Sequence, residues 1–431
     1  MKGNKIGAIT GFAIVVANMI GSGAFTSLGF QLNELNNPVA ILTLWVLGGI
    51  LALAGAFSYA EVGTTINKSG GEYSFLSQLY HPIIGYLSGW ISLTVGFAAP
   101  IALSAIAFVD YFPFMNMNSK WMGIALILFI TIIHMQNLKT SSRFQNIFTI
   151  LKIILITGFI VIGLFLSGDS GNTFTLGQSY FSEISSMPFA VGLIYVSYSY
   201  SGWNAAAYIT EEFEKPKKAL PFALIGGTLL VTVLYSLLQF VFLKHVSSDE
   251  LAGQVNVGAI AANAMLGKSI GRFFSLAISL LLISSISAMV WIGPRVTSCI
   301  AQKYYMWRFF QPSRNGIPKR ALWLQFLIST ILIVSGTFEQ IMIYCGVLLT
   351  ISTMLVVYGV FILRIKGKEI DMKGYRSPLF PLFQIIYLLL SFWMILFTII
   401  EAPKETAIGM INLLIGLCSY FLSKKKDMLY S

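Results

Sequence analysis

Charged residues are scarce in this chain. Asp, Glu, Lys and Arg make up 10% of its 431 residues, whereas 56% are hydrophobic. The three Cys and three His are scattered without metal-ligand spacing, so we expect no disulfide framework, no metal site and no cofactor. Apolar runs close to the spanning length of about 20 residues recur along the whole sequence. This composition excludes a soluble globule and predicts an all-α, multi-pass protein of the lipid bilayer.

The charge that is present is mostly basic, with a net charge of +11. Most Lys and Arg residues fall in alternate loops and in the two terminal segments, which is the pattern of cytoplasmic loops in membrane proteins. We therefore expect both termini in the cytoplasm and attribute the basic charge to topology rather than to nucleic-acid binding. No cleavable signal peptide is expected, because the first apolar run is too long and lacks a small-residue cleavage site.

Twelve membrane spans are predicted in one transmembrane domain covering residues 1–431. They are 6–32, 38–64, 83–112, 121–137, 145–167, 188–210, 221–243, 270–301, 320–337, 340–364, 379–400 and 405–423. An outer loop of helical character is expected at 247–268. A basic and aromatic inner loop at 301–320 is expected to lie on the membrane surface.

The first span contains Gly21-Ser22-Gly23 at mid-membrane depth. Glycine costs about 1 kcal/mol inside a helix, so this triplet favours a helix that stops and restarts. A restarted half-helix exposes free N–H groups and a positive dipole end, which suit a carboxylate. The alternative is that these small residues only allow a neighbouring helix to approach closely.

A second interruption is expected in the sixth span, where residues 195–204 form the most polar stretch inside any span. The first ten spans divide into two sets of five, at about 6–167 and 188–364. Because each set has an odd number of spans, the second set crosses the membrane in the opposite direction to the first. The last two helices, within 379–423, are then additions to this repeat. Interruptions at matching places in inverted halves indicate a transporter binding site. Alternatively, the serines and tyrosines only form hydrogen bonds across the bundle.

Several short motifs occur in a distinctive order. They are Met19 to Gly23, Gly70-Gly71-Glu72-Tyr73, Ser201-Gly202-Trp203-Asn204, Glu211-Glu212, Lys215-Pro216, Gly293-Pro294-Arg295 and Tyr375 to Pro378. Together they resemble the amino acid–polyamine–organocation superfamily of permeases, and most of all its L-type amino acid transporter branch and bacterial relatives. The resemblance implies a LeuT-like five-plus-five inverted repeat with broken helices 1 and 6. It also implies a bacterial cytoplasmic (inner) membrane as the location.

The resemblance assigns roles at the two breaks. The substrate carboxylate is expected on backbone N–H groups of Ser22, Gly23 and Ala24. The substrate ammonium is expected on backbone carbonyls, which are those of Met19, Ile20, Tyr198, Ser199 and Ser201. Tyr198 matches an aromatic gate that closes over the substrate from outside, and Asn204 matches a polar residue near the second break. Ser201 departs from the Gly of close relatives, which bears on the pocket volume.

Two charged residues, Lys152 and Arg295, lie within spans. An ionisable residue inside a membrane span is a candidate functional residue, because burying a charge there is costly. The resemblance places Lys152 where sodium-dependent members bind a coupling ion, next to Ser285 in span 8. The alternatives for Lys152 are proton carriage and an interfacial anchor. Arg295, near the inner end of span 8, is expected either to snorkel or to join an inner gate with Glu61 or Glu72.

The predicted function is sodium-independent transport of neutral L-amino acids by alternating access, through exchange or proton coupling. No carboxylate is expected near the pocket to hold a cationic side chain. A transporter of cationic amino acids or amines, a channel and a non-transporting sensor are the alternatives. Enzyme activity is not expected, because no catalytic set is spaced within the spans. The loop 111–120 has no Cys, so we expect no disulfide-linked partner subunit.

Overall fold

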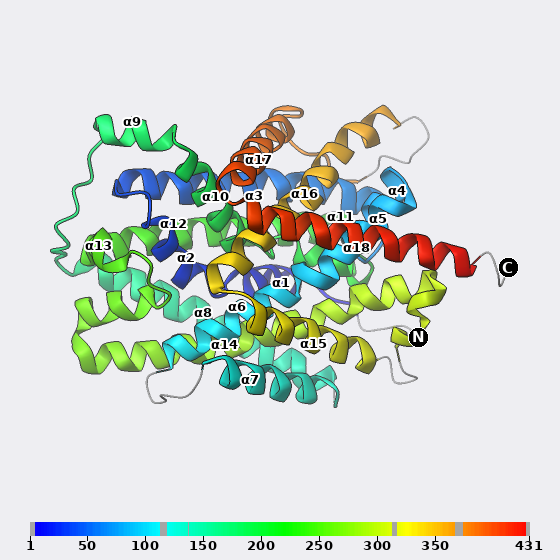
Figure 1. The fold of residues 1–431 in the computed structure, drawn as a ribbon, viewed down its shortest axis with the longest axis horizontal. Coiled ribbons are helices and arrows are strands. Elements are labelled where there is room, and N and C mark those ends of the chain that lie inside the picture. The colour runs from blue at the N-terminus through cyan, green and yellow to red at the C-terminus, as the bar shows by residue number, and fades with distance from the viewer. Residues whose placement is uncertain (1–4, 113–118, 137, 313–316, 367–373, 428–431) are drawn as a thin grey trace.

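The computed structural model describes residues 5–112, 119–136, 138–312, 317–366 and 374–427. Every regular element in these ranges is a helix, and the one β-bridge found there joins Ile6 to Phe213 (Figure 1). Nine helices of the described ranges are long and apolar enough to cross a membrane. The prediction of an all-helical, multi-pass membrane protein is therefore confirmed.

The first half of the chain forms ten helical elements. They are α1 (Ala8–Met19), α2 (Gly23–Gln31), α3 (Pro38–Ile66), α4 (Glu72–Leu79), α5 (Pro82–Ile91), η1 (Ser92–Gly96), α6 (Ala98–Tyr111), α7 (Ser119–His134), α8 (Leu138–Phe165) and α9 (Gln178–Ile184). Local sequence explains the start of α3: Pro38 occupies its first position, and the Asn37 side chain accepts hydrogen bonds from the N–H groups of Val39 and Ala40.

The second half forms twelve elements. They are α10 (Met187–Ser199), η2 (Ala205–Glu212), α11 (Pro216–Pro221), η3 (Phe222–Gly226), α12 (Gly227–His245), α13 (Ser248–Leu251), α14 (Val257–Lys303), η4 (Tyr305–Phe310), α15 (Lys319–Ser335), α16 (Phe338–Ile365), α17 (Leu382–Glu401) and α18 (Pro403–Asp427). Gly267, with φ of +77° and ψ of 163°, interrupts α14 close to residue 270, where span 8 is predicted to start. The element therefore consists of two helices that meet at this glycine, and the first lies within the predicted outer loop of helical character.

Each of the twelve predicted ranges contains helix, but three of the helices are short. Met187–Ser199 and Lys120–His134 are apolar helices below the length of a full span, and α15 has 17 residues. The short helix α10 has a clear cause, because the chain leaves the helical path after Ser199. In Figure 1, α9 and α13 lie at one end of the long axis of the bundle and α4 lies toward the other.

Candidate functional site

Two interruptions lie inside the bundle, one in each half of the chain. Helix α1 ends at Met19 and α2 begins at Gly23, so Ile20 to Ser22 form the first break. Helix α10 ends at Ser199 and the 3₁₀ helix η2 begins at Ala205, so residues 200–204 form the second. The polar stretch from 195 is thus helical up to Ser199, and only its last part is unwound.

The two interrupted segments are in direct contact beside their breaks. A Cβ added at Gly202, whose φ is +96°, would lie 2.7 Å from the carbonyl oxygen of Asn18, and one added at Gly23 would lie 2.7 Å from the Cα of Ser199. The hydroxyls of Ser27 and Ser199 are 2.7 Å apart. Real Cβ atoms do not approach backbone this closely, so both glycines are needed for the breaks to meet.

Replacing Gly202 by alanine is expected to lower the transport rate more than tenfold. The methyl group would strain the positive φ and push the second break away from Asn18. Uptake by purified protein in liposomes measures the effect. Gly171→Ala is the matched control, because Gly171 also has a positive φ, of +69°, but an added Cβ there meets nothing within 4 Å. Equal loss in both variants would contradict the contact argument.

The start of α2 faces a small cavity. The first N–H groups of any helix lack intrahelical acceptors, and Ser22, at the N-cap of α2, makes no side-chain capping bond. The cavity is lined by Asn18, Met19, Gly21, Ser22, Gly23, Pro100, Ser104, Tyr198, Ser199, Ser201, Ser285 and Met289. The hydroxyl of Tyr198 lies beside that of Ser22, and Asn18 Oδ1 is buried without a hydrogen-bond partner in the described part of the chain. Unused donors and acceptors thus meet in one place.

Lys152 of α8 is 1% exposed, and its side chain contacts the first break. Its Nζ donates to the Ile20 carbonyl at 2.9 Å and to Ser285 Oγ of α14 at 2.7 Å, and lies 3.4 Å from the Ala17 carbonyl. Ser285 also donates to the Ile20 carbonyl, at 3.1 Å. Complete burial rules out an interfacial anchor for Lys152. The carbonyl of Ile20 already accepts two hydrogen bonds, which is its full capacity.

Two side chains of α12 also hold the first break, and the sequence did not single them out. The hydroxyl of Tyr235 donates to the Met19 carbonyl at 2.6 Å, and Gln239 Nε2 donates to the Ala24 carbonyl at 2.9 Å. The two residues are four apart, so they share one face of the helix. The sequence did contain a sign of this contact, because two polar side chains four residues apart in an apolar span indicate a polar partner on one face of the helix.

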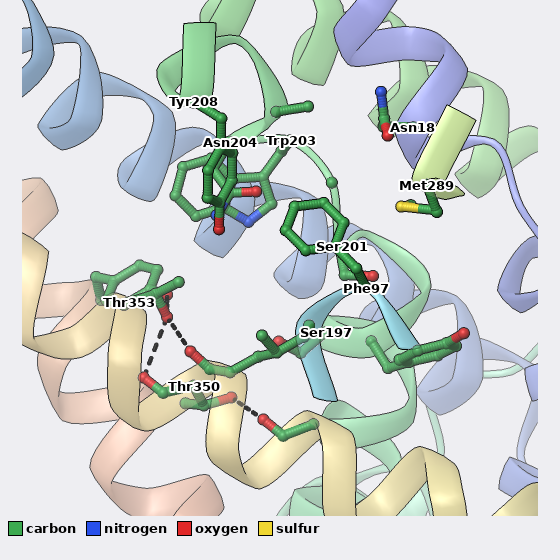
Figure 2. A pocket seen from close by; sticks show the side chains of 17 residues that line it. Asn18, Phe97, Ser197, Ser201, Trp203, Asn204, Tyr208, Met289, Thr350 and Thr353 are labelled. Atoms are coloured by element: carbon green, nitrogen blue, oxygen red, sulfur yellow. Dashed lines mark hydrogen bonds between the residues drawn. The ribbon is translucent and has the colours of Figure 1, made fainter. Parts of the chain in front are cut away.

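A larger cavity adjoins the small one and shares Asn18, Tyr198, Ser201 and Met289 with it. Figure 2 shows Trp203, Asn204 and Tyr208 at one part of its wall, with Thr350 and Thr353 of α16 at another. The hydroxyl of Tyr387, from α17, donates to Thr353 at 2.6 Å. None of the described residues that line either cavity is charged.

The prediction that no carboxylate lies near the pocket is wrong. Glu72 is 3% exposed, and its Oε1 accepts hydrogen bonds from the Tyr59 hydroxyl at 2.8 Å and from Asn204 Nδ2. Gly70 and Gly71, with φ of +108° and +56°, turn the chain so that α4 begins inside the bundle. This turn was predicted only as a short loop, so the position of Glu72 was missed.

Arg295 forms an ion pair, but with a partner that was not predicted. Its Nη1 lies 2.8 Å from Glu212 Oε1 at the end of η2, whereas Glu61 pairs with Arg364 and Glu72 contacts Tyr59 and Asn204. Glu212 was not predicted as the partner of Arg295, because its position is set by the path of η2 after the second break. Both residues line a further cavity, whose wall includes Tyr208 of the larger central cavity. The ion pair therefore lies in a cavity that shares one lining residue, Tyr208, with the central cavity.

Comparison with known proteins identifies the family of the chain. Residues 6–419 match the family model described as amino acid permease. The chain is 29% identical to the serine/threonine exchanger SteT of Bacillus subtilis, over 98% of this chain and 97% of the relative. It is 29% identical to the human b(0,+)-type amino acid transporter 1 (97% and 87% covered), and 27% identical to the mouse large neutral amino acids transporter small subunit 2 (97% and 80% covered). A match of this extent shows that the chain belongs to the amino acid permease family of the APC superfamily and is a transporter rather than an enzyme.

Proposed function

We propose that this permease exchanges neutral L-amino acids across the membrane by alternating access, without sodium. The observation that carries the proposal is the contact between the breaks α1–α2 and α10–η2 beside buried, uncharged cavities. Helix ends that meet at a break offer free N–H groups to an anion and free carbonyls to a cation. A zwitterionic amino acid needs both in one place.

In this proposal, the substrate carboxylate binds the N–H groups of Ser22, Gly23 and Ala24, with the Ser22 hydroxyl as a further donor. The ammonium binds backbone carbonyls at the opposed ends, which are those of Met19, Tyr198, Ser199 and Ser201. The unpaired Asn18 Oδ1 supports this placement, because it is a buried acceptor in the same cavity. Ile20 is left out, because Lys152 and Ser285 already use its carbonyl.

Sodium independence is inferred from Lys152. Its ammonium sits between the Ile20 carbonyl and Ser285 Oγ, so the oxygen atoms that would coordinate a cation are already in contact with a positive charge. Lys152 also joins α8 and α14 to the first break. A movement of the first break during transport would therefore also move α8 and α14, because the Lys152 side chain connects all three.

Alternating access needs a closure at each end of the site. We assign Arg295, Glu212 and Tyr208 to the cytoplasmic closure and Tyr198 to the outer one. The proposed topology has twelve spans, a five-plus-five inverted repeat with two added helices, and both termini in the cytoplasm of a bacterial cell. The chain is proposed to work without a disulfide-linked subunit, because residues 111–120 contain no Cys.

Transport of cationic amino acids is the second candidate, and the buried carboxylate of Glu72 favours it. Asn204 stands between Glu72 and the cavity, however, and none of the described lining residues carries a charge. A desolvated cationic side chain would thus lack a direct counter-charge. Neutral substrates fit this lining better.

Proteoliposome uptake tests the proposed function. With labelled neutral amino acids outside, we expect saturable uptake that rises several-fold when the same amino acids are enclosed inside. Stimulation only by an inward proton gradient would indicate proton symport instead. Preference for lysine or arginine would favour the second candidate, and flux without saturation or counterflow would indicate a channel.

A further inference from the structure

A buried carboxylate stands behind the wall of the larger cavity. Glu72 Oε1 accepts hydrogen bonds from Tyr59 of α3 and from Asn204 at the second break. The hydroxyl of Tyr208, from η2, lies beside the carboxylate, whereas that of Tyr387, from α17, donates to Thr353. Neither of the two ion pairs found in the described ranges involves Glu72. Asn204 lines the larger cavity and also donates to Glu72, so it connects the carboxylate to the cavity wall.

The carboxylate decides which end of the Asn204 amide faces the cavity. An ionised carboxylate only accepts hydrogen bonds, so it binds the NH₂ group of Asn204. Because Asn204 lines the cavity, the remaining end of its amide, Oδ1, is available to a bound molecule. An asparagine held by no partner could present either a donor or an acceptor, whereas this one presents an acceptor.

We propose that Glu72 is a positioning residue that makes the wall at Asn204 a hydrogen-bond acceptor. The pocket then selects amino acids whose side chain carries a hydrogen-bond donor, with a hydroxyl as the simplest case. This inference rests on the proposed function, in which the small cavity at α2 takes the carboxylate and ammonium and the larger cavity takes the side chain. Hydroxyls at Ser197, Thr350 and Thr353 add to the polarity of that larger cavity.

Threonine and valine are the probes, because they differ by a hydroxyl in place of a methyl group. For the wild-type protein we expect the KM of threonine to be about tenfold lower, since valine leaves the Asn204 oxygen unpaired. In Glu72→Gln, the introduced amide can donate as well as accept, so Asn204 is free to turn over. The KM ratio is then expected to fall to within about twofold of unity, a change of one hydrogen bond.

A paired substitution separates orientation from simple structural damage. In Glu72→Gln combined with Asn204→Asp, the introduced amide donates to the introduced carboxylate, whose second oxygen faces the cavity in either orientation. We expect the threonine preference to return to within about twofold of the wild-type value. The control is Glu250→Gln, an exposed carboxylate of α13, for which the ratio should not change.

Two results would overturn the inference while leaving the proposed function standing: an unchanged threonine-to-valine ratio in an active Glu72→Gln protein, or no rescue in the paired variant. If Glu72→Gln does not fold, Asn204→Leu tests the inference instead. This variant lacks the acceptor, so we expect it to lose the preference for threonine over valine. A retained preference would contradict the role of Asn204. Failure of the wild-type protein to transport any amino acid would instead overturn the proposed function.

Discussion

Replacing Lys152 by methionine is expected to lower the rate of exchange about 100-fold. Methionine keeps most of the volume of the lysine stem but removes both short hydrogen bonds, to the Ile20 carbonyl and to Ser285 Oγ. Hydrogen bonds to a charged group are worth about 1.5–3 kcal/mol each, and a net loss of about 3 kcal/mol in the transport transition state corresponds to this factor. Initial rates of counterflow in proteoliposomes, measured across pH, give the effect.

Lys244→Met is the matched control for this variant. Lys244 also donates to three backbone carbonyls, those of Gly163, Leu164 and Leu166, but it does so at the end of α8, away from the breaks. We expect its exchange rate to stay within about twofold of wild type, because these groups are partly exposed to water. Wild-type rates with an unchanged pH profile in Lys152→Met would remove Lys152 from the mechanism.

Replacing Glu61 by glutamine is expected to reduce the free energy of unfolding by about 3 kcal/mol. The Glu61 side chain has no solvent exposure, and both of its oxygens lie 2.8 Å from nitrogens of Arg364. The same carboxylate accepts the N–H of Ser377, so it also anchors the segment between α16 and α17. Removing the negative charge leaves a partly buried guanidinium uncompensated. Reversible unfolding in mixed micelles measures the loss.

The ion pair of Arg295 and Glu212 provides the comparison. Its side chains are 31% and 44% exposed, so Glu212→Gln is expected to change the free energy of unfolding by less than about 1 kcal/mol. If the cytoplasmic closure is assigned correctly, Glu212→Gln alters the exchange rate while Glu61→Gln mainly alters stability. Similar destabilisation in both variants would contradict the distinction based on burial.

The positions of the breaks could be predicted because Gly21, Gly23 and Gly202 leave a local signal in the sequence. Positions set by folding could not be predicted in the same way. Glu72 reaches the pocket wall only because two glycines turn the chain before α4. The partner of Arg295 follows from the path of η2, which has a non-helical residue, Ile209, within it. Local composition predicts where a helix stops, whereas side-chain partners depend on how separate helices pack.

The bridge between Ile6 and Phe213 bears on how the protein is made. The Lys5 side chain and the Glu211 carbonyl that reinforce it lie 206 residues apart in sequence. At a synthesis rate of about 5–20 residues per second, the first broken helix waits roughly 10–40 s for its partner. During that interval the polar groups of the break would be costly in hydrocarbon. We therefore expect the insertion machinery to retain the first helix until the sixth emerges from the ribosome.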